Sequence, residues 1–180
     1  MMYKAYAGNG DDATPEDVQE EMKKLAKWLD DEGFVLRTNG NKTGDVFELG
    51  STKFEEYLPW NTFNKKKSKY HNVSEDAKEL ASRFFPKYKE LKESVQKIIG
   101  ANSHMILGEN LRDPVKFLVV WTNDGVEKLE NVTFKTGFAA QSIKIASSRK
   151  IPVFNLKNPD AIERLKRFVA TIKDESSLDF

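Results

Sequence analysis

The segment "VKFLVVWT", residues 115–122, decides the fold class of this chain. Its apolar residues form an almost unbroken run, which is typical of a strand buried on both faces of a parallel sheet. Other strand-like segments lie at residues 3–7, 34–38, 55–60 and 151–156. Helical segments separate them, and this alternation predicts βαβ units joined by right-handed crossovers.

Helix signals fill the intervals between these strands. The clearest helix starts at Thr14 and Pro15, where a capping residue precedes a proline at the first helical position, and it ends before Gly33. Further helices are expected at residues 45–51, 74–85, 87–99, 138–148 and 158–172. We therefore predict a single α/β domain over residues 1–180, Rossmann-like, with a mainly parallel sheet, helices on both faces and a helical insert at about residues 64–110.

Charge balance and the absence of cysteine exclude several classes of protein. The 29 Lys and Arg residues stand against 28 Asp and Glu residues, and a net charge of +1 gives no basis for a protein that coats nucleic acid. Disulfides, thiolate metal sites and cysteine nucleophiles are excluded because the chain has no cysteine. No apolar run approaches the roughly 18 residues of a membrane span, and the N-terminal stretch lacks the apolar core of a secretion signal. We expect a cytoplasmic protein that does not associate with membranes.

Four loops are the candidate binding regions. In parallel α/β sheets, ligands bind outside the carboxyl ends of the strands. The predicted strands and helices place four loops there: Gly8–Thr14, Thr38–Asp45, Thr122–Gly125 and Thr136–Gln141. We therefore expect the ligand-binding side chains in these loops.

The loop after the first predicted strand combines glycines with acidic residues. Gly8, Gly10 and Ala13 have the G-x-G-x-x-A spacing of a phosphate-binding turn, and the N-terminus of the helix that follows attracts anions. Asp11 and Asp12, however, place carboxylates where the phosphate would lie. The alternative interpretation is an acidic helix start after a glycine turn. Standard NAD binding is not expected, because the second predicted strand does not end in an acidic residue.

The second loop ends in a pair of carboxylates. Asp45 and Glu48 are three residues apart near the start of a helix and therefore share one face. Such a pair can bind ribose hydroxyls, hold a metal ion or position a catalytic water. The alternative is structural: Asp45 stabilises the helix N-terminus and Glu48 lies on a solvated face. A divalent cation is thus a candidate cofactor, and the identity of any cofactor stays open.

Two further features carry alternative interpretations. Gly137 precedes a helix, so a phosphate could lie on the backbone N–H groups there; an ordinary turn from strand to helix is the alternative. The basic run Lys65–Lys67 is either a solvated loop or a weak attractor of nucleotide phosphate. His71 and His104 have no second histidine at metal-binding spacing, and we expect structural or surface roles for them.

The four loops, taken in order, resemble those of a Rossmann-like family of phages and bacteria. The family opens on Y-A-G-I-G-S-R-x-T-P, and residues 6–15 read YAGNGDDATP. Its second motif, L-R-S-G-G-A-x-G-A-D-x-x-F-E, is similar to LRTNGNKTGDVFE at residues 36–48, and its Y-L-P-W-x-x-F is present at residues 57–63. Later similarities lie at residues 102, 107–108, 114–115, 119–122, 124–125, 141, 143, 146 and 151–156. The family lies near the SLOG superfamily, which includes the Lonely-Guy nucleotide phosphoribohydrolases and the DprA-type DNA-processing proteins.

The resemblance implies a protein that binds a nucleotide or a nucleotide-derived small molecule at the carboxyl edge of the sheet. Some members of the superfamily cleave the bond between base and ribose, whereas others sense ligands or handle DNA. On this chain the expected ligand-binding residues are Gly8, Asn9, Gly10, Asp11, Asp12, Arg37, Thr38, Asn39, Gly40, Asp45, Trp121, Thr122, Thr136, Gly137 and Gln141. Asp45 and Glu48 are the candidate catalytic residues.

Departures from the family pattern weigh against phosphate binding and catalysis. Asp11 and Asp12 replace the family's S-R, Gly137 is followed by Phe138 instead of a second glycine, and Ala101 replaces an expected arginine. The phosphoribohydrolase signature P-G-G-x-G-T-x-x-E has no counterpart. We therefore predict a SLOG-like binding protein with weak or no catalysis, and with an accessory, sensor or sequestering role in the host cytoplasm if the chain is phage-encoded.

Two alternatives to this function stay open. One is a nucleotide N-glycoside hydrolase similar to the phosphoribohydrolases. The other is a module that interacts with DNA or a host protein, although the near-neutral charge does not favour nucleic acid as a partner. The resemblance also implies a homo-oligomer, since related proteins often pair.

Overall fold

The computed structural model describes residues 4–178 and contains one sheet of five parallel strands. The strands are β1 (Ala5–Gly8), β2 (Val35–Thr38), β3 (Phe54–Glu56), β4 (Leu118–Val120) and β5 (Val153–Asn155). Their order in the sheet is β3-β2-β1-β4-β5, so the direction of winding reverses between β1 and β4. The predicted α/β class with a parallel sheet is confirmed, and ligands of such sheets bind near the reversal point.

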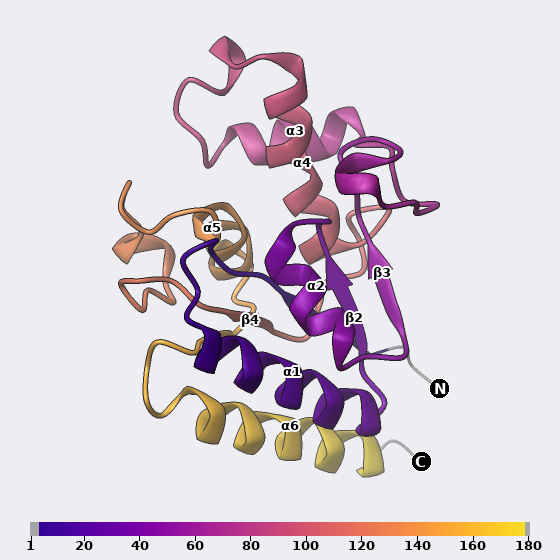
Figure 1. The fold of residues 1–180 in the computed structure, drawn as a ribbon, viewed down its shortest axis with the longest axis vertical. Coiled ribbons are helices and arrows are strands. Elements are labelled where there is room, and N and C mark those ends of the chain that lie inside the picture. The colour runs from indigo at the N-terminus through magenta and orange to yellow at the C-terminus, as the bar shows by residue number, and fades with distance from the viewer. Residues whose placement is uncertain (1–3, 179–180) are drawn as a thin grey trace.

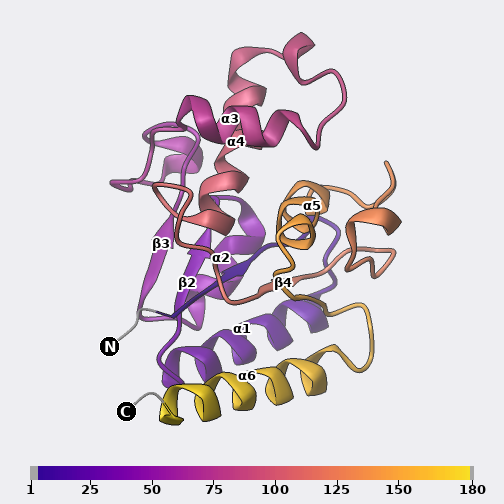
Figure 2. The same ribbon diagram turned by 180° about the vertical axis from the view of Figure 1, so that it is seen from behind.

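Helices cover both faces of the sheet. They are α1 (Glu16–Asp31), α2 (Lys42–Leu49), α3 (Glu75–Ser82), α4 (Glu93–Leu107), α5 (Ala140–Ser148) and α6 (Ala161–Leu178), with short 3-10 turns η1 (Phe63–Lys65), η2 (Tyr88–Glu90) and η3 (Leu129–Asn131). Figures 1 and 2 show from opposite sides that α1 and α6 lie side by side along one face of the sheet, while α4 and α5 lie on the other. α2 packs against α1, and α3 packs against α4. Within residues 4–178, no helix combines the length and the apolar character needed to cross a bilayer.

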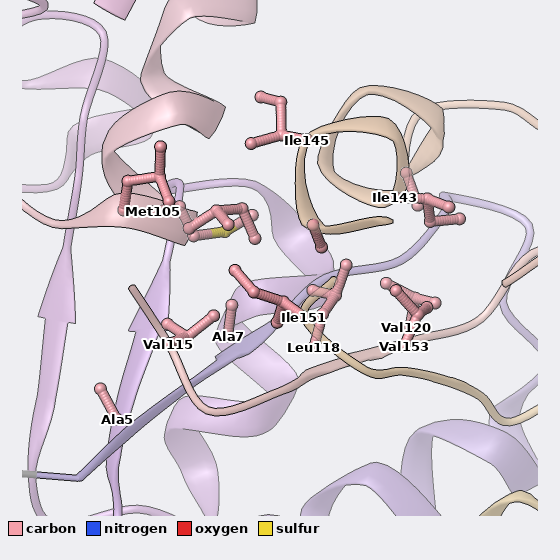
Figure 3. Close-up of a cluster of buried hydrophobic side chains, with 14 of the residues drawn as sticks. Ala5, Ala7, Met105, Val115, Leu118, Val120, Ile143, Ile145, Ile151 and Val153 are labelled. Atoms are coloured by element: carbon pink, nitrogen blue, oxygen red, sulfur yellow. The ribbon is translucent and has the colours of Figure 1, made fainter. Parts of the chain in front are cut away.

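Alternation along β1 separates two hydrophobic cores. Tyr6 faces α1 and α6, where its ring stacks on that of Phe117 with centroids 5.4 Å apart. Ala5 and Ala7 face the opposite way, and their small side chains leave room for Met105 of α4 beside the sheet. Figure 3 shows this second cluster between the sheet, α4 and α5. The C-terminal half of α4 therefore belongs to the layer that covers the sheet.

α2 begins earlier than the sequence predicts. The side-chain oxygen of Asn41 accepts a hydrogen bond from the backbone N–H of Gly44 (2.8 Å), so Asn41 caps a helix that starts at Lys42 rather than at residue 45. Asp45 consequently lies in the first turn of α2. The earlier start shortens the loop after β2 to residues 39–41.

The helix predicted at residues 87–99 is displaced toward the C-terminus. Lys87 has a left-handed backbone (φ 61°), the 3-10 turn η2 follows it, and α4 then runs unbroken to Leu107. α3 ends at Ser82, ahead of Pro86, rather than at residue 85. The end of α3 agrees with the steric pressure that a proline puts on the residue before it, which disfavours helical backbone.

Candidate functional site

A hydrogen-bonded group of asparagine side chains, which we call the asparagine network, lies at the carboxyl edge of β1 and β2. Asn9, directly after β1, is fully buried. Its side-chain nitrogen donates to Ser142 Oγ of α5 (3.0 Å), and its side-chain oxygen accepts from the backbone N–H of Gly10 (2.8 Å) and from Asn41 Nδ2 (2.6 Å). One side chain thus connects the loop after β1 with α5 and with the start of α2.

A second pair of amides extends the asparagine network to α4. Asn39 Nδ2 donates to Asn102 Oδ1 (3.0 Å), and Asn102 Nδ2 donates to the backbone carbonyl of Ile99 (3.1 Å). Asn9 and Asn102 are buried, whereas Asn39 and its neighbour Asn41 are half-buried. Asn39 and Asn41 are therefore the partly exposed members of the network, and their carboxamides carry both donors and acceptors.

Three carboxylates and one ammonium group form the carboxylate cluster, which consists of Asp45, Glu48, Glu56 and Lys66. Oxygen atoms of the three acids lie within 4.8 Å of one another. Lys66 Nζ pairs with all three, at 3.4 Å from Glu48 Oε2, at 2.9 Å from Glu56 Oε2, and in closest contact with Asp45. Thr38, the last residue of β2, donates from Oγ1 to Glu48 Oε1 (2.8 Å). The cluster therefore joins β2, β3 and α2 to the loop that carries Lys66.

The carboxylate cluster contains a group that titrates near neutral pH. Burial and the neighbouring Glu56 carboxylate raise the pKa of Glu48 to about 7, although Thr38 and Lys66 oppose the shift. Burial lowers the pKa of Lys66, but its hydrogen bonds with Asp45 and Glu56 outweigh burial and raise that pKa overall. Glu48 can thus change its protonation state near neutral pH while Lys66 stays charged.

The carboxylate cluster also has the donor set of a site for a hard cation. Carboxylate oxygens are the ligands that Mg²⁺ and Ca²⁺ prefer. The Lys66 ammonium lies among these oxygens, so a divalent ion would have to displace it. Asp45, Glu48 and Glu56 are therefore the residues that could hold a cation, and Lys66 is their internal counter-ion.

The loop after β1 and the turn before α5 meet through Asp11. A Cβ atom on Gly137 would collide with the Asp11 carboxylate, and the positive φ of Gly137 (93°) also favours glycine there. A Cβ atom on Gly10 would lie 2.5 Å from the methyl group of Thr43. Both glycines thus allow close packing against the protein's own side chains. An anion that approached Gly137 would meet the like charge of Asp11, with the exposed Asp12 next to it.

Several of the expected binding residues make contacts within the protein. Arg37 is fully buried, and its guanidinium pairs with two carboxylates at 2.7 and 3.2 Å. Trp121 is 5% exposed and packs in the core under α1 and α6. Gln141 donates to a backbone carbonyl of α3 (3.1 Å). Gly8 and Gly40 are buried against neighbouring apolar side chains. The contacts described for these five residues are therefore made outside the asparagine network.

Thr122 and Thr136 belong to a separate group of residues after β4. Their hydroxyls donate to the two carboxylate oxygens of Asp124, at 2.8 and 2.7 Å, and Asn155 Nδ2 donates to Thr122 Oγ1 (2.6 Å). Burial raises the pKa of Asp124, but the bonds from the two threonines, together with backbone N–H groups, outweigh burial and lower it. The third and fourth predicted loops are thus joined to each other through Asp124.

The site also contains side chains that are absent from the expected ligand-binding residues. Glu56 is the last residue of β3, which spans Phe54–Glu56 instead of the predicted residues 55–60. Because ligands bind beyond the carboxyl ends of parallel strands, the corrected strand places Glu56 among the candidate site residues. The basic run suggests a solvated loop, whereas the Lys66 side chain is only 18% exposed and pairs with three acids. Nothing in the run distinguishes Lys66 from its neighbours. Asn102 lies in the middle of α4, where no local pattern indicates a partner in the loop after β2.

Comparison of this chain with protein-family models, with curated proteins and with solved structures finds no match. Membership of the SLOG superfamily therefore stays a prediction from the motifs. The asparagine network and the carboxylate cluster are the features from which a function can be argued.

Proposed function

We propose that the carboxyl edge of β1 and β2 binds a nucleotide or a nucleotide-derived small molecule, and that it contacts this ligand through hydroxyl and amide groups. The supporting observation is that the asparagine network and the carboxylate cluster lie together around the first turns of α2. Carboxamides can pair with both donors and acceptors on the edge of a base, and carboxylates accept hydrogen bonds from ribose hydroxyls. The proposed role is binding without catalysis.

The acidic loop after β1 disfavours a phosphate group at this edge. Two like unit charges 4 Å apart repel by about 4 kcal/mol at an effective dielectric constant of about 20. Asp11 lies over Gly137, so a phosphate there would face this repulsion. A nucleoside should therefore bind at least as tightly as its 5′-monophosphate.

Isothermal titration calorimetry against nucleosides, their 5′-monophosphates and NAD-derived metabolites tests the proposal. We expect saturable binding of at least one of these compounds, and about tenfold weaker binding by Asn39→Ala, which removes one or two hydrogen bonds. Asn110→Ala is the matched control, because Asn110 is exposed after α4 and lies outside the asparagine network and the four candidate loops. The absence of heat with every compound, or an equal loss in both variants, would refute the proposal.

Hydrolysis of an N-glycosidic bond is a second candidate function, favoured by the pKa of Glu48. A general acid works best when its pKa lies near the operating pH, and the pKa of Glu48 is about 7. In this reaction the protonated Glu48 would donate its proton to the departing base as the bond to ribose breaks. Asp45 would stabilise the positive charge that develops on the sugar, and water would then add to C1′ and return a proton to Glu48.

Chromatography of free base released from nucleosides and 5′-monophosphates tests this second function. Release should fall by about 100-fold or more in Glu48→Gln and in Asp45→Asn. Glu20→Gln, on the exposed face of α1, is the control and should match the wild type. Release that is absent, or unchanged in both site variants, would exclude hydrolysis and leave the binding result intact.

A further inference from the structure

A groove with a volume of about 700 Å³ lies between the segment that joins α3 to α4 and the pair formed by α5 and η3. Figures 1 and 2 show from opposite sides that this segment projects beyond the sheet on the side of α5 and η3. Lys144 of α5 donates to the backbone carbonyl of Phe84 (2.9 Å) and thereby ties the two walls together. The lining contains no residue of the asparagine network or the carboxylate cluster. The groove is therefore a second, separate feature of the surface.

The groove is basic. Arg83, Lys87, Lys89 and Lys144 line it, against a single acid, Glu90. Lys87 and Lys89 are exposed, and among residues 4–178 neither forms an ion pair. Two of the four cations are thus available to an anionic partner.

The turn that carries the two lysines is held by Gln96 of α4. The hydroxyl of Tyr88 donates to the backbone carbonyl of Gln96 (2.8 Å), and Gln96 Nε2 donates to the carbonyls of Tyr88 (3.1 Å) and Leu91 (3.2 Å). Lys87 begins this turn in the left-handed region. Because the backbone is already ordered, the turn loses little conformational freedom when a partner binds, which favours affinity.

Aromatic side chains supply an apolar surface beside these cations. Phe84, Phe85 and Tyr88 line the groove. Phe134 and Phe138, on the loop that leads into α5, are 93% and 71% exposed. Large exposed aromatic side chains are more frequent at interaction surfaces than on the rest of a protein surface. A partner of the groove should therefore combine negative charge with an apolar side chain that contacts Phe84 or Phe85.

Acidic residues around the groove limit the length of that partner. Glu79 of α3 pairs with Arg83 at 3.3 Å, and Glu75 and Asp76 are exposed on the same helix. Glu93 opens α4 just after the basic turn. A strand of nucleic acid carries a phosphate at every nucleotide and needs an extended basic track, which these acids interrupt. A short peptide with a few carboxylates meets no such obstacle.

We propose that this groove docks a short acidic peptide segment of a partner protein. Carboxylates of the peptide pair with Lys87 and Lys89, and one apolar side chain packs against the half-buried Phe84, Phe85 and Leu129. The proposal does not depend on the ligand of the sheet edge, because the two sites share no residue.

Panning a displayed library of random heptapeptides on the intact protein tests the docking site. We expect enrichment of peptides that combine Asp or Glu with an aromatic or aliphatic residue. The most enriched peptide, synthesised with a fluorescent label, should bind Lys87→Glu/Lys89→Glu at least about tenfold more weakly than the wild type. Lys23→Glu/Lys24→Glu, on the exposed face of α1, changes the net charge equally and should leave the affinity unchanged.

A milder variant guards against a folding artefact. Lys87→Asn/Lys89→Gln removes the charges, and asparagine tolerates the left-handed backbone at position 87. This variant should keep the wild-type melting curve and show an intermediate loss of affinity. The proposal is overturned if no acidic peptides are enriched, or if both charge-reversal variants lose affinity equally. It is also overturned if a labelled oligothymidylate binds more tightly than the peptide and is the ligand lost in Lys87→Glu/Lys89→Glu.

Discussion

The carboxylate cluster and the basic groove differ in where their counter-charge comes from. In the cluster, Lys66 inserts among three acids and neutralises part of their charge from within the chain. In the groove, four cations face one acid, and two exposed lysines have no ion pair within the described residues. The net charge of +1 is therefore the sum over regions of opposite charge, with excess acid in the carboxylate cluster and excess base in the groove. The comparison indicates that Lys66 supplies a counter-ion to the carboxylate cluster from within the chain, whereas Lys87 and Lys89 of the groove can pair with an anionic partner.

Removal of the internal counter-ion is expected to have the largest effect. Lys66→Met leaves three acids facing one another, so the free energy of unfolding at pH 8 should fall by about 2–3 kcal/mol, less than for a fully buried pair because the cluster reaches solvent. Urea denaturation measures this change. Lys67→Met, at the exposed neighbouring position, should stay within about 0.5 kcal/mol of the wild type. Equal stability of the two variants would show that the ion pairs of Lys66 contribute nothing.

A divalent cation should compensate for the missing lysine. Millimolar Ca²⁺ or Mn²⁺ should raise the melting temperature of Lys66→Met by several degrees, because an ion that binds only the folded state stabilises it by mass action. The wild type should respond less, since Lys66 competes with the ion for the same oxygens. Thermal melts with and without EDTA make the comparison. A shift that persists when Asp45→Asn is added to Lys66→Met would place the ion elsewhere.

The pH dependence of stability isolates Glu48. Its pKa is raised from 4.5 to about 7 in the folded protein, so the folded state holds the proton more tightly than the unfolded state over that range. The wild type should therefore lose stability as the pH rises from 4.5 to about 7, whereas Glu48→Gln, which cannot ionise, should not lose this contribution. Melting temperatures across this window measure the difference. Parallel curves for the two proteins would contradict the raised pKa.

The smallest expected effect concerns the loop after β1. Asp12→Arg replaces an exposed carboxylate with a cation, and should improve the affinity for a 5′-monophosphate relative to its nucleoside by about threefold, the strength of one exposed ion pair. Calorimetry gives the two affinities. Asp31→Arg, exposed at the far end of α1, makes the same charge change away from the edge and should leave the ratio unchanged. A ratio that is unchanged or lowered in Asp12→Arg would count against the proposal that the acidic loop after β1 disfavours phosphate.

The fold could be predicted from local sequence because its signals are local. The apolar run at residues 115–122 predicts a central strand, and β4 does lie between β1 and β5. Thr14 and Pro15 predict the start of α1 to within a residue. Pro15 rather than Thr14 occupies the capping position, and the Thr14 hydroxyl donates to the carbonyl of Asp11 (2.6 Å).

The site could be predicted only in part. Because ligands bind beyond the carboxyl ends of parallel strands, the sequence predicts site residues that include Asn9, Asn39, Asp45 and Glu48. The structure brings these residues to one edge of the sheet. Lys66 could not be selected in this way, because its partners come from α2 and β3 and meet it only in the folded chain. The same holds for Arg37, whose strand-end position suggests a ligand contact although long-range ion pairs hold it in the interior.

Asn9 has one further consequence, which concerns the chemical ageing of the protein. It precedes Gly10, and Asn-Gly is the dipeptide most prone to deamidation, because glycine lets its amide nitrogen reach the side-chain carbonyl carbon. In the fold, the Asn9 carboxamide is buried and bonded to Ser142 and Asn41, so ring closure first requires the loop after β1 to open. Deamidation would then add a carboxylate to an edge that is already acidic. Peptide mapping of stored protein measures the rate of this deamidation. That rate therefore reports how often the loop after β1 opens locally.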